Sequence, residues 1–246
     1  MVPVEREDTV VHQETLRLNK FLALAGIGSR RKNDELILSG DVKVNGRIVL
    51  ELGTKVDPAT DRITVRGKPV ELAQKTIYIL LNKPKDCITT LNDEKGRTTV
   101  MDYVHVKQRV YPVGRLDRDT TGVLLLTNDG ELAHTLTHPS FEILKAYRAR
   151  LAKGINAADF RRLLRGVRLN DGMAKINEAR VVPGTRRTGV LVAVHEGRNR
   201  LVRRVFETLE YEVKALERIS FAGLTTQGLA RGKWRFLTRK EVESLR

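Results

Sequence analysis

Residues 114–130 read Gly-Arg-Leu-Asp-Arg-Asp-Thr-Thr-Gly-Val-Leu-Leu-Leu-Thr-Asn-Asp-Gly, and the rest of the chain is organised around this stretch. The apolar run at 123–126 is too short for a helix of ordinary length. It begins after a glycine and ends at the turn residues 128–130, which predicts a buried strand between two turns. The polar residues before the strand therefore lie on a loop that leads into a rigid element.

Asp117 is the candidate functional residue of that loop, because reactive groups are often presented where a loop meets a rigid strand. Its neighbours Arg115 and Arg118 favour the ionised carboxylate. An ionised carboxylate suits a nucleophile or a base, and it does not suit a general acid at neutral pH. The alternative is a turn aspartate that only bonds local backbone groups.

The composition favours a polyanionic partner. The chain has 246 residues, with 45 Lys and Arg against 30 Asp and Glu and a formal net charge of +15. Such an excess of positive charge favours nucleic acid. A membrane surface is the rival partner, but no stretch resembles an amphipathic anchor and no apolar run approaches the length of a membrane-spanning helix. We therefore expect a nucleic-acid partner and no membrane.

The N-terminal stretch and the cysteine content indicate a cytoplasmic protein. Residues 1–13 are of mixed charge without an apolar core, so we expect no signal peptide. We interpret residues 1–15 as a mobile tail because they show no periodicity. The single cysteine, Cys87, excludes an internal disulfide and fits a reducing compartment.

Residues 16–74 are predicted to form a small domain of two helices and a sheet. Apolar residues recur at helical spacing over 18–25, and Ser29 is placed to cap a second helix. Residues 42–49 alternate around Asn-Gly, which is the strongest short signal for a β-hairpin. Polar residues and a proline at 66–75 predict the linker to the next domain.

Three cations open the predicted second helix of this domain: Arg30, Arg31 and Lys32. Positive side chains in a first turn gain nothing from the helix dipole. An external anion would relieve that cost, so the three residues are candidate RNA ligands. A solvated run of charges is the alternative.

Residues 76–246 are predicted to form a second, mixed domain. Helices and strands alternate irregularly at hairpin-like spacing, with strands at 77–81, 145–151 and 190–195 and a helix at 157–165. This pattern favours a largely antiparallel mixed sheet with flanking helices over a doubly wound parallel sheet. The predicted fold class is therefore α+β in both domains.

Tyr147 and an arginine cluster are further candidates. Tyr147 is an aromatic residue on a basic strand, and it is either a core residue or a platform on which an extruded base stacks. On a helix, the arginines after residue 198 either form a solvated face or bind phosphates or a carboxylate. The cluster comprises Arg198, Arg200, Arg203 and Arg204.

The sequence gives no indication of a metal or cofactor. The five histidines lack metal-ligand spacing, and the pair His134 and His138 has no third ligand nearby. No glycine-rich dinucleotide or phosphate motif occurs. We therefore expect neither a metal site nor a cofactor.

The stretch at 114–130 resembles the catalytic signature of the pseudouridine synthases of the RsuA/RluB type, namely Gly-Arg-Leu-Asp, two variable residues, Thr, one residue, Gly, a Leu-rich run and Thr-Asn-Asp-Gly. The Lys-Ala-Tyr at 145–147 and the Glu-Gly-Arg-Asn-Arg that begins at 196 also resemble motifs of this family. The resemblance implies that Asp117 is the catalytic aspartate, that Tyr147 stacks on the uracil, and that Arg203 pairs with Asp117. Arg204 is the alternative for that pairing.

The Asn-Lys-Pro at 82–84 resembles another motif of the family, although Asp86 stands where a glycine is usual. Residues 16–74 resemble the small RNA-binding module of a small-subunit ribosomal protein, through Leu-Asn-Lys at 18–20, Ser-Arg-Arg at 29–31 and Val-Asn-Gly at 44–46. That likeness implies RNA binding without a stated target.

Together these resemblances imply an isomerase that converts a specific uridine of ribosomal RNA to pseudouridine, with 23S rRNA of the large subunit as the expected substrate. The target base would be flipped out of its stack. Arg115 and the arginines from 198 to 204 would hold phosphates. The expected partner is ribosomal RNA or a pre-ribosomal particle, and we expect a monomer. The rivals are a non-catalytic ribosome-assembly RNA-binding protein and a hydrolytic RNA enzyme.

Overall fold

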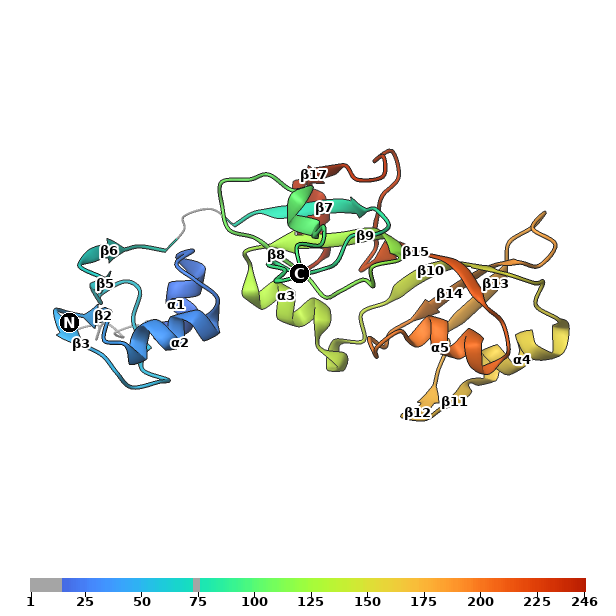
Figure 1. Cartoon of the computed structure of the whole chain (residues 1–246), viewed down its shortest axis with the longest axis horizontal. Helices are drawn as coiled ribbons and strands as arrows, with labels where there is room; N and C mark the ends of the chain where they lie inside the picture. Colours follow the sequence, from blue (N-terminus) through green and yellow to red (C-terminus); the bar gives the residue numbers. More distant parts are fainter. Residues whose placement is uncertain (1–14, 73–75) are drawn as a thin grey trace, which may run out of the picture. The chain divides into compact units, whose positions relative to one another are not determined.

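The computed structural model describes residues 15–72 and 76–246. The chain forms two compact units, Met1–Lys75 and Thr76–Arg246, and each is considered by itself. Both units combine helices with sheets (Figure 1), so the α+β prediction is confirmed. The mobile tail expected at residues 1–15 lies outside the described residues except for Thr15.

The first unit is built from two helices, α1 (Leu18–Leu24) and α2 (Arg30–Leu38), which pack on small sheets. Ser29 caps α2 as predicted, since its side chain accepts a hydrogen bond from the Lys32 amide. The hairpin is also confirmed: Asn45 (φ 51°) and Gly46 (φ 80°) form its turn. The strands are β1 (Leu16–Arg17), β2 (Val42–Val44), β3 (Arg47–Ile48), β4 (Lys55–Val56), β5 (Ile63–Val65) and β6 (Lys68–Val70).

The linker prediction for residues 66–75 is partly wrong. Lys68–Val70 forms β6, which pairs with β5 and places Pro69 opposite Thr64. Because β6 is an edge strand in the order β3-β2-β5-β6, its proline removes no hydrogen bond from a central ladder. Residues 73–75 lie outside the described residues.

The second unit is organised around a mixed sheet with the strand order β13-β14-β10-β15-β9-β7-β17, with β16 beside β15 and β8 beside β9. Its strands are β7 (Tyr78–Lys83), β8 (Tyr111–Pro112), β9 (Thr120–Thr127), β10 (Lys145–Leu151), β13 (Glu178–Val181), β14 (Gly189–Val194), β15 (Val213–Phe221), β16 (Leu224–Thr225) and β17 (Trp234–Phe236). A separate hairpin joins β11 (Val167–Leu169) to β12 (Gly172–Ala174).

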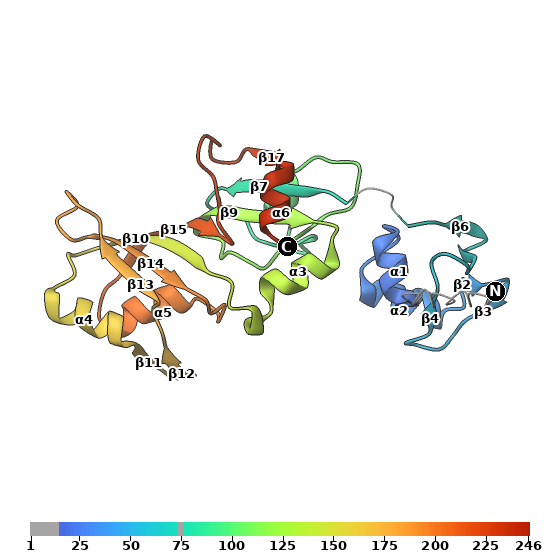
Figure 2. The same cartoon turned by 180° about the vertical axis from the view of Figure 1, so that it is seen from behind.

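Helices cover both ends of this sheet. The helices are α3 (Gly130–Thr137), α4 (Ala157–Arg165), α5 (Leu201–Thr208) and α6 (Arg239–Ser244), with short 3₁₀ turns at Val100–Asp102 and Pro139–Phe141. Helices α4 and α5 pack on the part formed by β10, β14 and β15. Residues from α3 and α6 form a second cluster on β7 and β9, and α6 is seen in front of these strands in Figure 2.

The central strands β7 and β9 are buried on both faces, which explains why the run at 123–126 is continuously apolar. Leu124 and Leu126 enter one hydrophobic cluster, whereas Val123 and Leu125 enter the cluster with α3 and α6. Alternate residues of a strand point to opposite faces. The strand that follows the Asp117 loop is therefore fixed from two sides.

Strand β9 also runs parallel to β15, with Gly122 opposite Arg218. A Cβ atom at position 122 would lie 2.1 Å from the Arg218 carbonyl oxygen, and the residue has φ +107°. Only glycine allows both the close approach and this backbone conformation. Gly122 therefore holds the end of the Asp117 loop against β15. Among the described residues, no helix is long and apolar enough to cross a membrane.

Candidate functional site

Asp117 lies in the loop between β8 and β9, as predicted, at a pocket of about 290 Å³. Its backbone carbonyl accepts a hydrogen bond from the Thr120 amide at 3.1 Å, which closes a turn just before β9. The side chain is 32% exposed. The charged and aromatic residues that line the same pocket include Arg115, Lys145, Tyr147, Arg198, Arg200 and Arg218.

Two arginines of the segment before and within α5 face the Asp117 loop. The Arg200 guanidinium lies 3.6 Å from Asp117 and 3.9 Å from Asp119. Arg203 is buried and lies 2.8 Å from Asp119, and it also donates a hydrogen bond to the Val213 carbonyl. The pairing implied by the resemblance therefore differs in the structure, since Arg203 meets Asp119 and Arg200 meets Asp117.

The reason for this difference is the backbone at the start of α5. Arg200 has φ 47°, so it precedes the helix in a left-handed conformation and does not share a helical face with Arg203. Its side chain thereby reaches outward to Asp117, while Arg203 points inward from the first turn. Arg204, the alternative partner, contacts Asp171 instead.

The backbone of this loop is also held by Lys83, a buried cation that the sequence analysis named only as part of the Asn-Lys-Pro motif and to which it gave no role. Its Nζ donates to the carbonyls of Pro84, Arg118 and Thr120 at 3.0, 3.3 and 3.0 Å. Burial lowers the pKa of Lys83, and nearby acidic groups partly oppose that effect. Lys83 thus ties the backbone on the C-terminal side of Asp117 to strand β7.

In the turn that follows Lys83, Asp86 stands where the family usually has a glycine. Asp86 has φ 60°, a left-handed conformation that aspartate tolerates better than most residues. Its carboxylate lies 3.3 Å from the Arg118 guanidinium, and both side chains are exposed. This exposed pair therefore links the turn to the Asp117 loop.

Tyr147 stands on β10 between two hydrophobic clusters and borders the pocket. It is partly buried, so its environment combines the two predicted alternatives of core residue and exposed platform. Lys145, two residues earlier, donates to the Ile143 and His195 carbonyls at 3.0 and 2.7 Å. Burial lowers the pKa of Lys145, and the charge of Arg218 lowers it further.

Comparisons with known proteins show the family of this chain. The family described as RNA pseudouridylate synthase matches residues 77–208, which is more than half of the chain. This chain belongs to the RNA pseudouridylate synthase family. The S4 domain, a separate family, matches residues 16–63.

Relatives match this chain along nearly its whole length. The chain is 47% identical to the ribosomal large subunit pseudouridine synthase B of Bacillus subtilis (strain 168), over 94% of this chain and 95% of that protein. It is 42% identical to an uncharacterized RNA pseudouridine synthase of Aquifex aeolicus (strain VF5), over 94% and 93%. A crystal structure of a pseudouridylate synthase matches with a TM-score of 0.67 and 28% identity, over 94% of this chain and all of that one.

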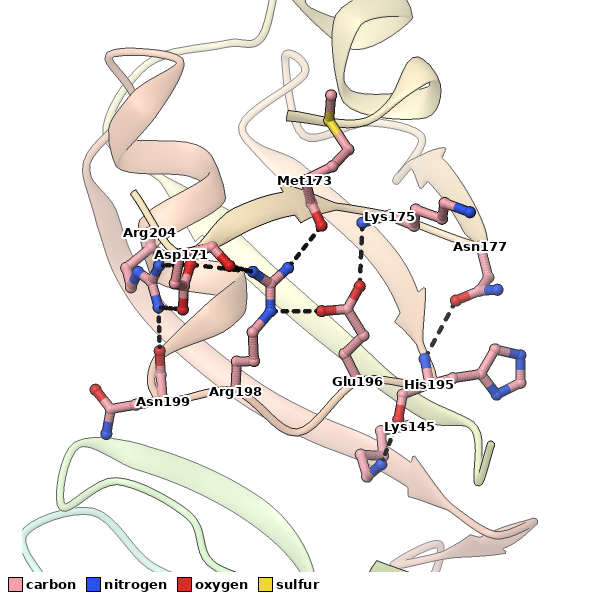
Figure 3. Close-up of polar contacts among 10 residues, drawn as sticks. All are labelled: Lys145, Asp171, Met173, Lys175, Asn177, His195, Glu196, Arg198, Asn199 and Arg204. Carbon is pink, nitrogen blue, oxygen red and sulfur yellow. Dashed lines mark hydrogen bonds and ion pairs between the residues drawn. The ribbon is translucent and has the colours of Figure 1, made fainter. Parts of the chain in front are cut away.

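Two of the arginines that the sequence analysis assigned to phosphates instead bind carboxylates and carbonyls of the protein itself (Figure 3). Arg198 donates to the Glu196 carboxylate at 2.6 Å, to the Asp171 carboxylate at 3.0 Å and to the Met173 carbonyl at 2.9 Å. Arg204 binds the Asp171 carboxylate and the Asn199 carbonyl. They hold residues 196–200 against the β11–β12 hairpin, so most of their donors are already used.

The other candidate cations remain accessible. Arg115 is exposed and lines the pocket. In the S4 unit, Arg30, Arg31 and Lys32 are exposed in the first turn of α2, and none has an ion pair within residues 15–72 or 76–246. Over the same described ranges, no group of three or more His, Cys, Asp or Glu could hold a metal ion.

Proposed function

We propose that this synthase isomerises one uridine of 23S ribosomal RNA to pseudouridine, without a cofactor, as a monomer in the cytoplasm. The observation that carries the proposal is the pocket that Asp117 and Tyr147 both line. The large-subunit target is supported by the 47% identity to a protein named for that subunit. The S4 unit and the net charge of +15 support RNA as the partner.

The reaction breaks the bond between the sugar and the base, turns the uracil and rejoins it through carbon 5. A base that is stacked in a helix cannot enter a pocket, so the target nucleotide is everted at a cost of a few kcal/mol. Arg115 and Arg200 are exposed at this pocket and are suited to hold the flanking phosphates. Arg198 and Arg204 contribute to phosphate binding indirectly, because they fix the loop that carries Arg200.

Asp117 supplies the reactive carboxylate. Its ion pair with Arg200 is long, at 3.6 Å, and no hydrogen bond to its side-chain oxygens occurs among the described residues. A carboxylate in this state keeps its lone pairs available. It can attack the sugar, attack the base or remove a sugar proton, and each of these routes uses the same free oxygen. Tyr147 stacks on the uracil while it turns.

The S4 unit adds affinity through a separate contact. Its three exposed cations Arg30, Arg31 and Lys32 bind RNA phosphates outside the pocket. Two linked binding units raise the effective concentration of the second contact once the first has formed. The S4 unit therefore contributes to the affinity for RNA, whereas the pocket performs the reaction.

A mapping experiment tests this proposal. Purified protein is incubated with separate transcripts of 23S and 16S ribosomal RNA, and pseudouridine is detected by carbodiimide labelling followed by reverse transcription. We expect a stop at one uridine of the 23S transcript and none in the 16S transcript. Modification of the 16S transcript alone would contradict the substrate assignment, and no modification of either RNA or of isolated pre-ribosomal particles would contradict the function.

A further inference from the structure

Arg218 occupies a central position that no motif of the sequence analysis singled out. It lies on β15, the strand between β10 and β9, and the register places it directly opposite Tyr147 on one side and Gly122 on the other. Residues opposite each other in neighbouring strands carry their side chains on the same face. Arg218 therefore shares a face of the sheet with the proposed stacking residue.

A β-bulge turns this part of β15 toward the pocket. The register shifts between Ala146 and Tyr147, where Ile219 is the extra residue in β15. After the shift, Phe221 falls on the same face as Arg218, and both line the pocket. The guanidinium lies over the Phe221 ring at 4.7 Å from its centroid. Bulges are often found beside active sites, where they redirect a side chain.

The charge of Arg218 is not neutralised by the protein. The residue is 2% exposed, its Nε donates to the Val123 carbonyl at 2.8 Å, and its Nη2 is sealed from solvent without a partner. Among the described residues no carboxylate forms an ion pair with it, whereas the equally buried Arg203 has Asp119 at 2.8 Å. A buried, unpaired guanidinium is costly, so its presence indicates a ligand that supplies the missing acceptor.

The position of Arg218 indicates which part of the RNA provides that acceptor. Arg115 and Arg200 are exposed, so they are accessible to RNA phosphates from solvent. Arg218 is buried beside an aromatic ring and beside Tyr147, where a flat, everted base fits better than a hydrated phosphate. A guanidinium has five donors and no acceptor.

We infer that Arg218 recognises the everted uracil by donating a hydrogen bond to its C4 carbonyl oxygen. This inference rests on the proposed function. Uracil and cytosine both have a carbonyl oxygen at C2, but cytosine has an amino group at C4, and a guanidinium, which has only donors, cannot hydrogen-bond to that group. Arg218 therefore acts in specificity as well as in binding.

A binding cycle tests the inference. The variants are Arg218→Met and, as the matched control, Arg235→Met, whose guanidinium pairs with Glu241 away from the pocket. All proteins also carry Asp117→Asn, so that the RNA is not converted during the titration. Each is titrated with three RNA fragments of 23S rRNA that are identical except at the target position, which holds uridine, cytidine or an abasic sugar.

We expect Arg218→Met to weaken binding of the uridine RNA about 10- to 100-fold, and to bind the abasic RNA within about 2-fold of the parent. The preference for uridine over cytidine should shrink by a similar factor. The Arg235→Met control should leave all three affinities within about 2-fold. An equal loss on uridine and abasic RNA would overturn the inference, since it would indicate a phosphate contact or a structural role.

Two further measurements keep this result separate from folding and from the proposed function. Arg218→Lys retains a buried cation and is used if Arg218→Met melts more than about 5 °C below the parent; because lysine has donors but no planar fork, the loss should be smaller but again larger on the uridine RNA than on the abasic RNA. Conversion of the target uridine by the protein with Asp117 intact is measured first. If that conversion is absent, the proposed function fails; if it is present and the affinities show no dependence on the base, only the role of Arg218 fails.

Discussion

The arginines of the segment from Arg198 to Arg204 contact two aspartates, Asp171 closely and Asp117 only at longer distance. Arg198 and Arg204 close on Asp171, at the turn of the β11–β12 hairpin, through several hydrogen bonds. Arg200, between them, approaches Asp117 only to 3.6 Å. The two carboxylates have similar exposure, 44% and 32%, so the difference lies in how completely their oxygens are occupied.

We propose that this difference separates a structural carboxylate, Asp171, from a reactive one, Asp117. Hydrogen bonds from Arg204 hold the pKa of Asp171 below its usual value, and its oxygens have little capacity left for a ligand. Asp117 has only the long ion pair with Arg200, while Lys83 and Gly122 fix the backbone of its loop against β7 and β15. A catalytic carboxylate needs its position fixed and its oxygens free, and only the second site meets both conditions.

The largest effect beyond Asp117 itself should come from Tyr147, the tyrosine that lines the same pocket. We expect Tyr147→Ala to lower the rate of pseudouridine formation about 10- to 100-fold, because a stacked base contributes roughly 1–3 kcal/mol. Tyr147→Phe keeps the ring and should lower it only a few-fold. Carbodiimide mapping under single-turnover conditions measures both rates, and equal rates for the two variants and the wild type would remove the stacking role.

A smaller effect is expected at Asp119, which pairs with the buried Arg203 two residues along the loop from Asp117. Asp119→Asn removes the charge that this buried arginine faces, so the arginines should shift and the rate should fall about 10-fold. Affinity for RNA should stay within a few-fold of the wild type. A loss of affinity with an unchanged rate would show that Asp119 acts on RNA binding instead.

The cluster of Asp171 with Arg198 and Arg204 should affect stability more than catalysis. We expect Asp171→Asn to leave the rate within about 3-fold of the wild type and to lower the melting temperature by about 2 to 4 °C. Circular dichroism and the mapping assay measure the two quantities. A rate loss that matched that of Asp119→Asn would contradict the contrast between the two sites.

The smallest effect is a pH dependence at the same residue. The pKa of Asp171 is lowered in the folded chain, so its contribution to stability is present above the unfolded value of about 3.9 and is lost as pH falls through the folded pKa. The difference in melting temperature between wild type and Asp171→Asn should therefore vanish in that acidic range. A difference that persisted unchanged at pH 2 would exclude the carboxylate charge as its cause.

Much of the fold could be predicted from local signals. The bounds of Lys145–Leu151 and Ala157–Arg165 agree with the expected strand and helix. The capping side chain of Ser29 and the Asn45-Gly46 turn were also read from residue type and spacing. These elements depend on periodicity, caps and turn residues, which the sequence displays directly. The three-residue strands of the β11–β12 hairpin carry too short a pattern to be recognised.

The site was harder to predict because its contacts join distant parts of the chain. Lys83 and Arg218 are charged residues on buried strands, and a hydrophobic pattern does not show which partner, if any, a charge will meet. The choice among Arg200, Arg203 and Arg204 depends on the left-handed backbone at Arg200, which residue spacing does not reveal. The position of Asp117 in the signature was enough to predict it as a site residue. Which arginine pairs with Asp117 depends on side-chain geometry, which the sequence does not show.

The most direct test compares Asp117→Asn with Asp119→Asn, two identical changes in charge that are two residues apart and share Arg200 as a neighbour. Pseudouridine formation on 23S rRNA is measured at saturating enzyme, with RNA affinity measured in parallel. We expect Asp117→Asn to abolish detectable formation while affinity stays within about 3-fold of the wild type, and Asp119→Asn to remain active at a reduced rate. Continued formation of pseudouridine by Asp117→Asn would contradict the assignment of the reactive carboxylate.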